Sequence, residues 1–156
     1  MRLQLCAVGR LRAGPERTLV DDYLDRCGKT GRALGLGPVS EHEVDERKAT
    51  GPGAQAPLLE RAIPSGAALV VLDERGRMLS SPEFAAELAK WRDAGRQDLA
   101  LVIGGADGVD PALRAKADLV VSLGAMVWPH MLARVMLAEQ LYRAATILAG
   151  LPYHRA

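Results

Sequence analysis

Short apolar runs alternate with amphipathic segments along the whole chain. Residues 67–73 and 99–103 (AALVVLD and LALVI) are almost continuously apolar, which is typical of strands buried on both faces of a parallel sheet. Residues 3–8 and 118–123 form similar runs, and the more polar residues 38–44 predict a weaker strand at a sheet edge. The pattern therefore predicts a mainly parallel sheet.

Segments with helical spacing of apolar residues separate these strands. We expect helices over residues 15–26, 54–63, 82–91, a short stretch from 111 and residues 131–149. Gly28 is predicted to end the first helix, and Ser81 is predicted to cap the third. Strand–helix alternation with short connections predicts a single α/β domain over residues 1–156, with helices flanking the sheet.

The composition is that of a folded protein and excludes several classes. The 156 residues are 49% hydrophobic, with 20 Lys and Arg against 19 Asp and Glu, so disorder is not expected. The longest strongly apolar run, residues 67–72, is too short to span a membrane, and no signal peptide is recognisable. Cys6 and Cys27 lack metal-ligand spacing, so we expect a cytoplasmic protein without structural zinc.

Three predicted strands end in unusual segments, at residues 72–76, 104–108 and 123–130. Ligands of open parallel sheets bind beyond the carboxyl ends of the strands. Gly104 and Gly105 would allow close approach of a ligand or of a crossing backbone, or they are simple turn residues. Neither a GxGxxG nor a Walker sequence is present, so phosphate-cradling nucleotide chemistry is not expected.

The third of these segments, residues 123–130, is apolar although it is irregular. Exposed loops are normally polar, so we expect this loop to be buried. Either a planar heteroaromatic ligand or ordinary core packing would cover it, and its backbone groups would still need hydrogen-bond partners.

Two arginines of the last helix raise different questions. Arg134 lies on the apolar face, where an unpaired charge would cost several kcal/mol. Its partner would be an acid across a dimer interface, a substrate phosphate or a cofactor carboxylate, unless it extends to solvent. Glu139 and Arg143, one turn apart on the opposite side, form either a solvated brace or part of a catalytic unit.

The C-terminal tail brings together Tyr153, His154 and Arg155. They combine a stacking ring, a group that titrates near neutrality and a phosphate-binding fork. Such a tail is either frayed or in contact with a nucleotide. From residue 130 onward arginines outnumber acidic residues three to one, whereas the whole chain carries only +1. RNA contacts are therefore expected at this end.

Several motifs in register resemble one known family. VVLDERG, SSPEFA, LVIGGADG, VSLGAM, PH, LARVMLAEQLYRA and the terminal PYHR occur in this order. Together they resemble the bacterial 23S ribosomal RNA pseudouridine N3-methyltransferases of the SPOUT superfamily, over nearly the whole chain. The resemblance implies a C-terminal trefoil knot, a homodimer packed through the terminal helices and S-adenosylmethionine as cofactor, without a metal. It also implies methylation of a pseudouridine on the assembled ribosome.

The resemblance also assigns residues. Its cofactor positions correspond to Leu72, Gly104, Leu123, Gly124, Ala125, Met126, Val127 and Trp128, and its substrate-binding positions to His130 and Arg134. Its catalytic positions correspond to Tyr142, Arg143, Tyr153, His154 and Arg155. His154 is the candidate general base, with solvent as the alternative. An arginine would stabilise charge on the ring carbonyls, and a tyrosine would stack on the target base.

Two other functions fit some of these features. A ribosome assembly factor could keep the same fold without turnover, and a cofactor titration would separate it from an enzyme. An unknotted, flavodoxin-like binder of small ligands would need a phosphate loop at a helix start, which the sequence lacks. For the methyltransferase, the low net charge predicts weak binding to isolated RNA.

Overall fold

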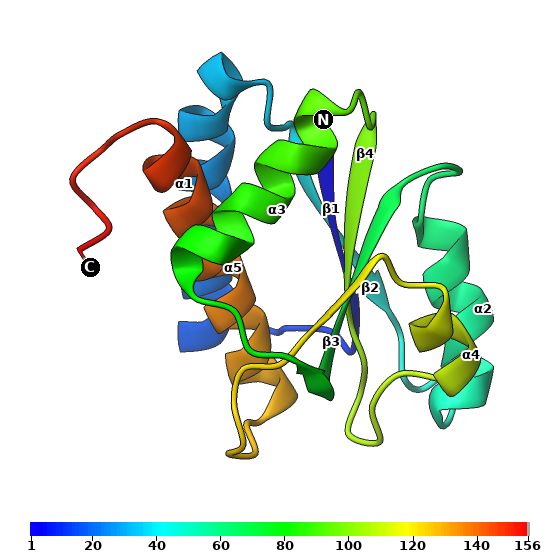
Figure 1. Ribbon diagram of the computed structural model, residues 1–156. Helices are drawn as coiled ribbons and strands as arrows, with labels where there is room; N and C mark the ends of the chain where they lie inside the picture. Colours follow the sequence, from blue (N-terminus) through cyan, green and yellow to red (C-terminus); the bar gives the residue numbers. More distant parts are fainter. Residues whose placement is uncertain (156) are drawn as a thin grey trace.

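The computed structural model describes residues 1–155, so Ala156, the last residue of the expected domain, lies outside the described part. A five-stranded sheet stands between two layers of helices (Figure 1). In chain order the elements are β1 (Arg2–Val8), α1 (Pro15–Gly31), a 3₁₀ turn (Arg32–Leu34), β2 (Val39–Val44), α2 (Pro52–Ala62), β3 (Ala68–Arg77), α3 (Ser81–Asp93), β4 (Asp98–Ile103), α4 (Pro111–Ala115), β5 (Leu119–Val121) and α5 (His130–Leu148).

The strands are ordered β2-β1-β4-β3-β5, and every pair is parallel. This confirms the predicted parallel sheet and the edge position of β2. All six residues of the central strand β4 are buried, which explains the apolar run that follows Asp98. Because the strands are parallel, their carboxyl ends meet at one edge of the sheet, where the three unusual segments begin.

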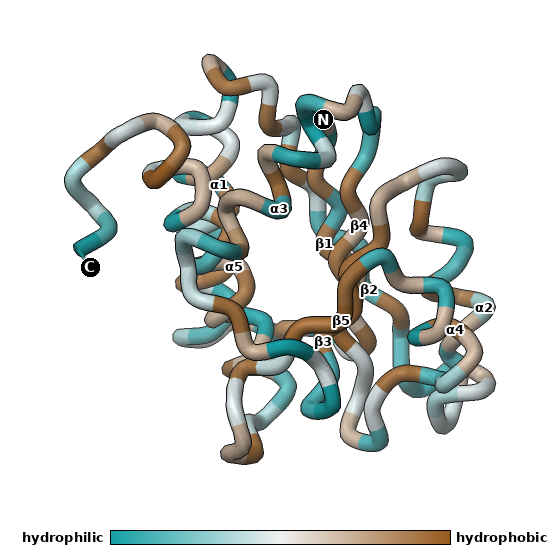
Figure 2. The backbone as a smooth tube through the Cα atoms, viewed as in Figure 1, coloured by the Kyte–Doolittle hydropathy of each residue, from teal (hydrophilic) through white to brown (hydrophobic). Residues whose placement is uncertain are grey.

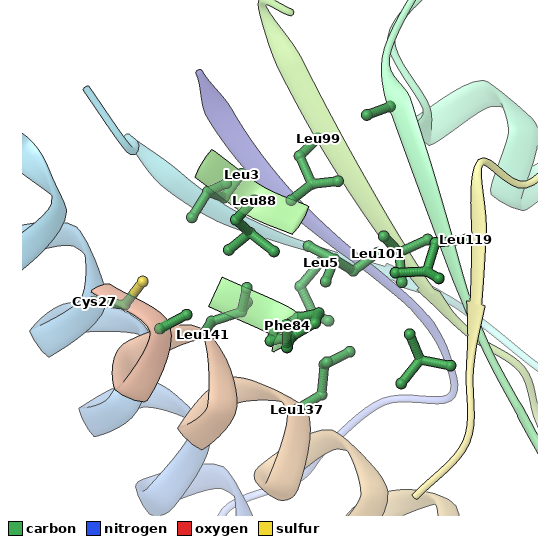
Figure 3. Packing of buried hydrophobic residues seen from close by; sticks show 14 of the residues in the cluster. Leu3, Leu5, Cys27, Phe84, Leu88, Leu99, Leu101, Leu119, Leu137 and Leu141 are labelled. Carbon is green, nitrogen blue, oxygen red and sulfur yellow. The ribbon is translucent and has the colours of Figure 1, made fainter. Parts of the chain in front are cut away.

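Both faces of the sheet are covered. Helices α1, α3 and α5 lie over one face and α2 and α4 over the other (Figure 1). On the first face, leucines of β1 and β4 pack against Phe84, Leu88, Leu137 and Leu141 of the helices (Figure 3). A smaller apolar cluster fills the other side, so the most hydrophobic segments run through the middle of the molecule (Figure 2).

Two predicted helix boundaries are wrong. Gly28 does not end α1, which continues to Gly31, because an internal glycine costs only about 1 kcal/mol and the packing of α1 on α5 outweighs it. The cap of α3 is Ser80 rather than Ser81. The Ser80 hydroxyl accepts a hydrogen bond from the Glu83 N–H, and the Glu83 carboxylate accepts one from the Ser80 N–H at 2.7 Å, which forms a capping box.

The last two strands of the sheet also differ from the prediction. β3 continues to Arg77, and both Leu72 and Arg77 pair with Val121 across an irregularity. β5 is correspondingly short, at three residues. The segment between Leu72 and Arg77 therefore bulges away from the sheet at the edge where the site forms.

The two cysteines are free and buried on opposite sides of the sheet, Cys6 with the smaller cluster and Cys27 with the larger. Burial raises the pKa of each thiol to about 12. None of the helices in residues 1–155 is long and apolar enough to cross a membrane. The same residues contain no group of three His, Cys, Asp or Glu side chains that could hold a metal ion.

Candidate active site

The carboxyl-terminal part of β3 and the segments that follow β4 and β5 converge on one cavity of about 320 Å³. Of the residues assigned to the cofactor, the cavity is lined by Leu72, Gly104, Leu123, Gly124, Met126, Val127 and Trp128, but not by Ala125. His130, the first residue of α5, also lines it. The structure thus brings together segments that are up to about 60 residues apart in the sequence.

The cavity combines apolar walls with an acidic rim. Leu72, Ile103 and Leu123 contribute apolar surface, while Asp73, Glu74 and Asp107 outnumber the single lining arginine, Arg75. The acidic residues stand within the strand-end segments, yet they were missing from the residues assigned to the site. An acidic side chain directly after a buried strand was the signal that could have identified them.

Asp73 is the best-fixed charge of this rim. Its carboxylate accepts hydrogen bonds from the Arg75 N–H at 2.9 Å and from the Arg114 guanidinium at 3.1 Å. Burial alone would raise the pKa of Asp73, but these hydrogen bonds and the nearby arginines outweigh it and the pKa is lowered. Asp73 therefore stays ionised at neutral pH, and Arg75 and Arg114 partly balance its charge.

Gly104 allows the backbone of Gly108 to pass close to it. A Cβ added there would lie 2.5 Å from the Gly108 carbonyl, so the 104–108 loop can close only without a side chain at this position. The Gly108 N–H donates to the Gly105 carbonyl at 3.0 Å and completes the loop. A Cβ added at Gly108 or Gly124, by contrast, would meet no atom within 4 Å. Both of these glycines line the cavity, and neither fills it with a side chain.

The apolar loop between β5 and α5 is not buried, contrary to the expectation. Val127 is 89% exposed, Met126 75% and Trp128 40%, and the loop tip below α5 is strongly hydrophobic (Figure 2). The Ser122 hydroxyl bonds the Gly124 N–H at 3.1 Å and its carbonyl at 3.2 Å, which satisfies part of the loop backbone. An exposed apolar loop at the mouth of a cavity is typical of a binding surface.

Arg134 is buried, as its position on the apolar face predicted, but its partners differ from all those expected. Only 1% of the residue is exposed, and its guanidinium donates to Glu41 at 3.0 Å and to Glu43 at 2.6 Å. It also donates to the Gly9 carbonyl at 2.8 Å. The partners are thus carboxylates of β2 in the same chain, and the charge does not extend to solvent. Arg134 thus joins α5 to β2 and the end of β1. Because its guanidinium is buried against these partners, we assign it a structural role in place of the expected contact with substrate.

The C-terminal tail is anchored to α5 rather than frayed. The helix ends with the Leu151 N–H bonded to the Thr146 carbonyl at 2.9 Å and the Gly150 N–H to the Ile147 carbonyl at 3.1 Å. Gly150 has φ +69°, as this helix-ending motif requires. The chain therefore turns back along the helix, and the Tyr153 hydroxyl reaches Glu139, to which it donates at 2.9 Å.

Four of the five candidate catalytic residues meet around Arg143. Its Nε donates to Glu139 at 3.0 Å, and its Nη1 lies 3.3 Å from Nδ1 of His154. The guanidinium stands 4.8 Å from the centre of the Tyr153 ring, which lies 4.6 Å from the ring of Tyr142. Burial, followed by the hydrogen bond to Glu139, raises the pKa of Tyr153. The fifth candidate, at position 155, is exposed at the end of the tail.

This tail cluster does not reach the cavity of its own chain. Glu139 is nine residues beyond His130 along α5, a distance of about 14 Å at 1.5 Å per residue. The tail lies beside the far half of α5, whereas the loops around the cavity lie at the carboxyl edge of the sheet (Figure 1). Within one chain, the two parts of the predicted site are separate.

A second, larger hollow of about 590 Å³ extends between these two parts, from Gly124 at the cavity to Glu139 at the tail cluster. It lies between α1, the segment before α3 and α5, and apolar residues such as Leu19, Met78 and Val135 line it. Leu19 is 42% exposed and Met78 is 75% exposed. The sequence pattern gave no sign of this hollow, because its residues come from elements that are distant in the chain.

The comparisons with known proteins agree with this architecture. Residues 1–154 match the family described as "Predicted SPOUT methyltransferase", and the chain belongs to this family of methyltransferases. It is similar to the protein named Ribosomal RNA large subunit methyltransferase H of Ruegeria pomeroyi, with 69% identity over 155 residues. The proteins of the same name from Roseobacter denitrificans and Cereibacter sphaeroides are each 70% identical. The alignments cover 99% of this chain and 99% of each relative.

A solved structure supports the fold alone. The probable methylase family protein from Haemophilus influenzae Rd KW20 superposes with a TM-score of 0.50 at 12% sequence identity. The superposition covers 99% of this chain and 70% of that one.

Proposed function

We propose that this protein methylates N3 of a pseudouridine in 23S ribosomal RNA, with S-adenosylmethionine as methyl donor. The observation that carries the proposal is the convergence of three strand-end segments on one cavity, in a chain of a methyltransferase family. The coarser part, methylation of large-subunit ribosomal RNA, is supported by the names of relatives that are about 70% identical. The nucleotide, the donor and action on the assembled ribosome in the cytoplasm follow from the family resemblance.

The residues of the cavity fit S-adenosylmethionine. Its volume, about 320 Å³, lies at the lower end of the range for small-molecule sites. Leucine and isoleucine walls suit an adenine ring, the absence of side chains at Gly104, Gly108 and Gly124 leaves room for it, and the carboxylates of the rim suit a cation. When bound, this cofactor supplies a methyl group whose bond to sulfur breaks, with the electron pair left on sulfur, as a bond to N3 forms.

The tail cluster supplies polar groups for the target base. In our proposal Tyr142 or Tyr153 stacks on the base, and Arg143 or Arg155 lies near the ring carbonyls, where negative charge develops when N3 loses its proton. His154 contacts the same region of the base. These roles require the tail and the cavity to come close to each other.

A homodimer would meet this requirement, with the tail of one copy beside the cavity of the other. The apolar hollow and the exposed apolar side chains at Leu19, Met78 and the 126–128 loop provide surface for such an interface. The close crossing of the chain where Arg77 pairs with Val121 is compatible with the trefoil knot that the family resemblance implies.

Calorimetric titration of the purified protein with S-adenosylmethionine, and separately with its demethylated product, tests the cofactor. We expect saturable binding of both, whereas no uptake of either would exclude the enzymatic function. Binding without any methyl transfer to ribosomes would instead favour the alternative of an assembly factor that lacks turnover.

Methylation of ribosomes from cells that lack this gene tests the substrate. Mass spectrometry of the digested 23S RNA should show one added methyl group on a pseudouridine after incubation with enzyme and cofactor. A protein-free RNA fragment should react poorly, because a chain of net charge +1 neutralises few phosphates. Efficient methylation of the fragment would contradict action on the assembled ribosome.

Sedimentation of Leu19→Glu tests the dimer. A carboxylate in the apolar hollow should disfavour association, so the variant should sediment as a monomer where the wild type is a dimer. Lys90→Glu, on the exposed side of α3, is the control for a charge change elsewhere. A monomeric wild-type protein would overturn this part of the proposal.

A further inference from the structure

The contact between Arg143 and His154 determines which nitrogen of the imidazole carries the proton. Nη1 of Arg143 lies 3.3 Å from Nδ1 of His154. A guanidinium has only N–H donors and no acceptor. The Nδ1 atom must therefore accept, and the proton of the neutral ring must be on Nε2. Protonation of Nδ1 would direct two N–H groups at each other and break this hydrogen bond.

Glu139 holds Arg143 in the position that this contact needs. One oxygen of its carboxylate accepts from Nε and Nη2 of Arg143 and from the Tyr153 hydroxyl. The other oxygen accepts from the side-chain amide Nε2 of Gln140 at 2.9 Å, and Oε1 of the same side chain accepts from the Ser81 hydroxyl at 2.7 Å. With two guanidinium nitrogens bound to the carboxylate, Nη1 is directed at His154. The Glu139 side chain is only 16% exposed, so it is more than a solvated brace.

We propose that His154 acts as a hydrogen-bond donor through Nε2–H rather than as general base, and that Glu139 is the positioning residue that maintains this state through Arg143. The inference rests on the proposed function for its substrate. In the reaction, the N3 proton passes to water, and the Nε2–H group donates to the neighbouring ring carbonyl, on which the resulting negative charge is shared. Donors at such a position typically accelerate a reaction by about 10²–10³.

The tautomer can be measured without any substrate. The chain has three histidines, so ¹⁵N-labelled protein gives three imidazole patterns, which His42→Gln and His130→Gln assign by elimination. In wild-type protein at pH 8 the His154 ring should show the Nε2–H tautomer. In Glu139→Gln it should shift to a mixture, whereas Glu87→Gln, on α3, should leave the pattern unchanged. The Nδ1–H tautomer, or a mixture in the wild type, would overturn the proposal.

Single-turnover methylation separates the donor from the base. The amide of His154→Gln can donate a hydrogen bond from a position close to Nε2 but cannot act as a base at neutral pH, whereas His154→Leu can do neither. We expect His154→Gln to stay within about 10-fold of the wild type and His154→Leu to fall by about 100-fold or more. Equal losses in the two variants would contradict donation. If wild-type enzyme does not methylate at all, the proposed function fails, and the tautomer measurement still decides the state of His154.

Discussion

The two ends of α5 use the same residue type for different purposes. Near the cavity, Arg134 is 1% exposed, and its partners are carboxylates of β2, about 90 residues away in the sequence. Near the tail, the Arg143 side chain is 24% exposed and is paired with Glu139 of its own helix. The buried arginine joins three elements and is inaccessible to solvent. The partly exposed arginine keeps one nitrogen for His154, so its environment leaves it available for chemistry.

Replacing each arginine by alanine should lower the free energy of unfolding by different amounts, more for Arg134 than for Arg143. Arg134→Ala leaves two carboxylates and the Gly9 carbonyl without a main partner, so we expect a loss of about 3 kcal/mol. In a domain of this size that loss corresponds to a fall of about 9 °C in Tm. Arg143→Ala removes a partly exposed ion pair together with its contacts to the tail, and should cost about 1 kcal/mol. Urea unfolding of both variants measures the difference, and equal losses would contradict the contrast.

Gly104→Ala should damage the cavity without changing the tail. The added methyl group would meet the Gly108 carbonyl at 2.5 Å, so the loop must shift. We expect cofactor affinity to fall about 10-fold or more, which is about 1.4 kcal/mol. The NMR pattern of His154 should stay as in the wild type. Gly53→Ala, whose nearest contact would be an ordinary 4.0 Å, is the matched control in the same calorimetric titration.

Gly150→Ala should disturb the tail and leave the cavity unchanged, the reverse of Gly104→Ala. At φ +69° a side chain is strained, and we expect a loss of about 1 kcal/mol together with a displaced tail. Methylation should slow, whereas the cofactor affinity measured by calorimetry should stay as in the wild type, because the tail does not line the cavity of its own chain. A variant with normal methylation would show that the position of the tail does not matter for the reaction.

The smallest expected effect is a difference in pH dependence at the buried end of α5. Burial would raise the pKa of Glu43, but hydrogen bonds from the Leu11 N–H and from Arg134 outweigh it and lower the pKa below 4.5. The stability from this pair is therefore complete above pH 4.5 and is lost as the pH falls through the lowered pKa. In urea unfolding between pH 6 and 3, the free energy of unfolding should fall less steeply with decreasing pH for Arg134→Ala than for the wild type. Identical slopes would remove Glu43 as the cause.

Much of the fold could be predicted from the sequence because buried parallel strands need apolar side chains on both faces. β3 and β4 were recognisable for this reason, and the edge strand β2 by its polarity. The spacing of Ser80 and Glu83 is that of a capping box, but the adjacent Ser81 is an equally plausible cap residue by type alone. The end of α1 was not recognisable, because the packing that carries the helix past Gly28 is a tertiary effect.

The site could be predicted only in part. The carboxyl ends of parallel strands meet at one edge, so three unusual strand ends were enough to locate the cavity. The need of Arg134 for an anion was evident, but which carboxylates supply it depends on contacts across about 90 residues. Likewise the helix spacing predicted the pair of Glu139 and Arg143, whereas their bonds to the tail depend on the turn at Gly150.

The two free thiols make each apolar layer separately observable. Cys6 is in the layer beneath α2 and α4, and Cys27 is in the layer beneath α1, α3 and α5. With the pKa of each at about 12, almost no thiolate exists at neutral pH, and an alkylating reagent reacts only when the surrounding layer opens. The labelling rates of the two cysteines, followed by mass spectrometry, therefore report whether the two sides of the sheet separate together or one after the other.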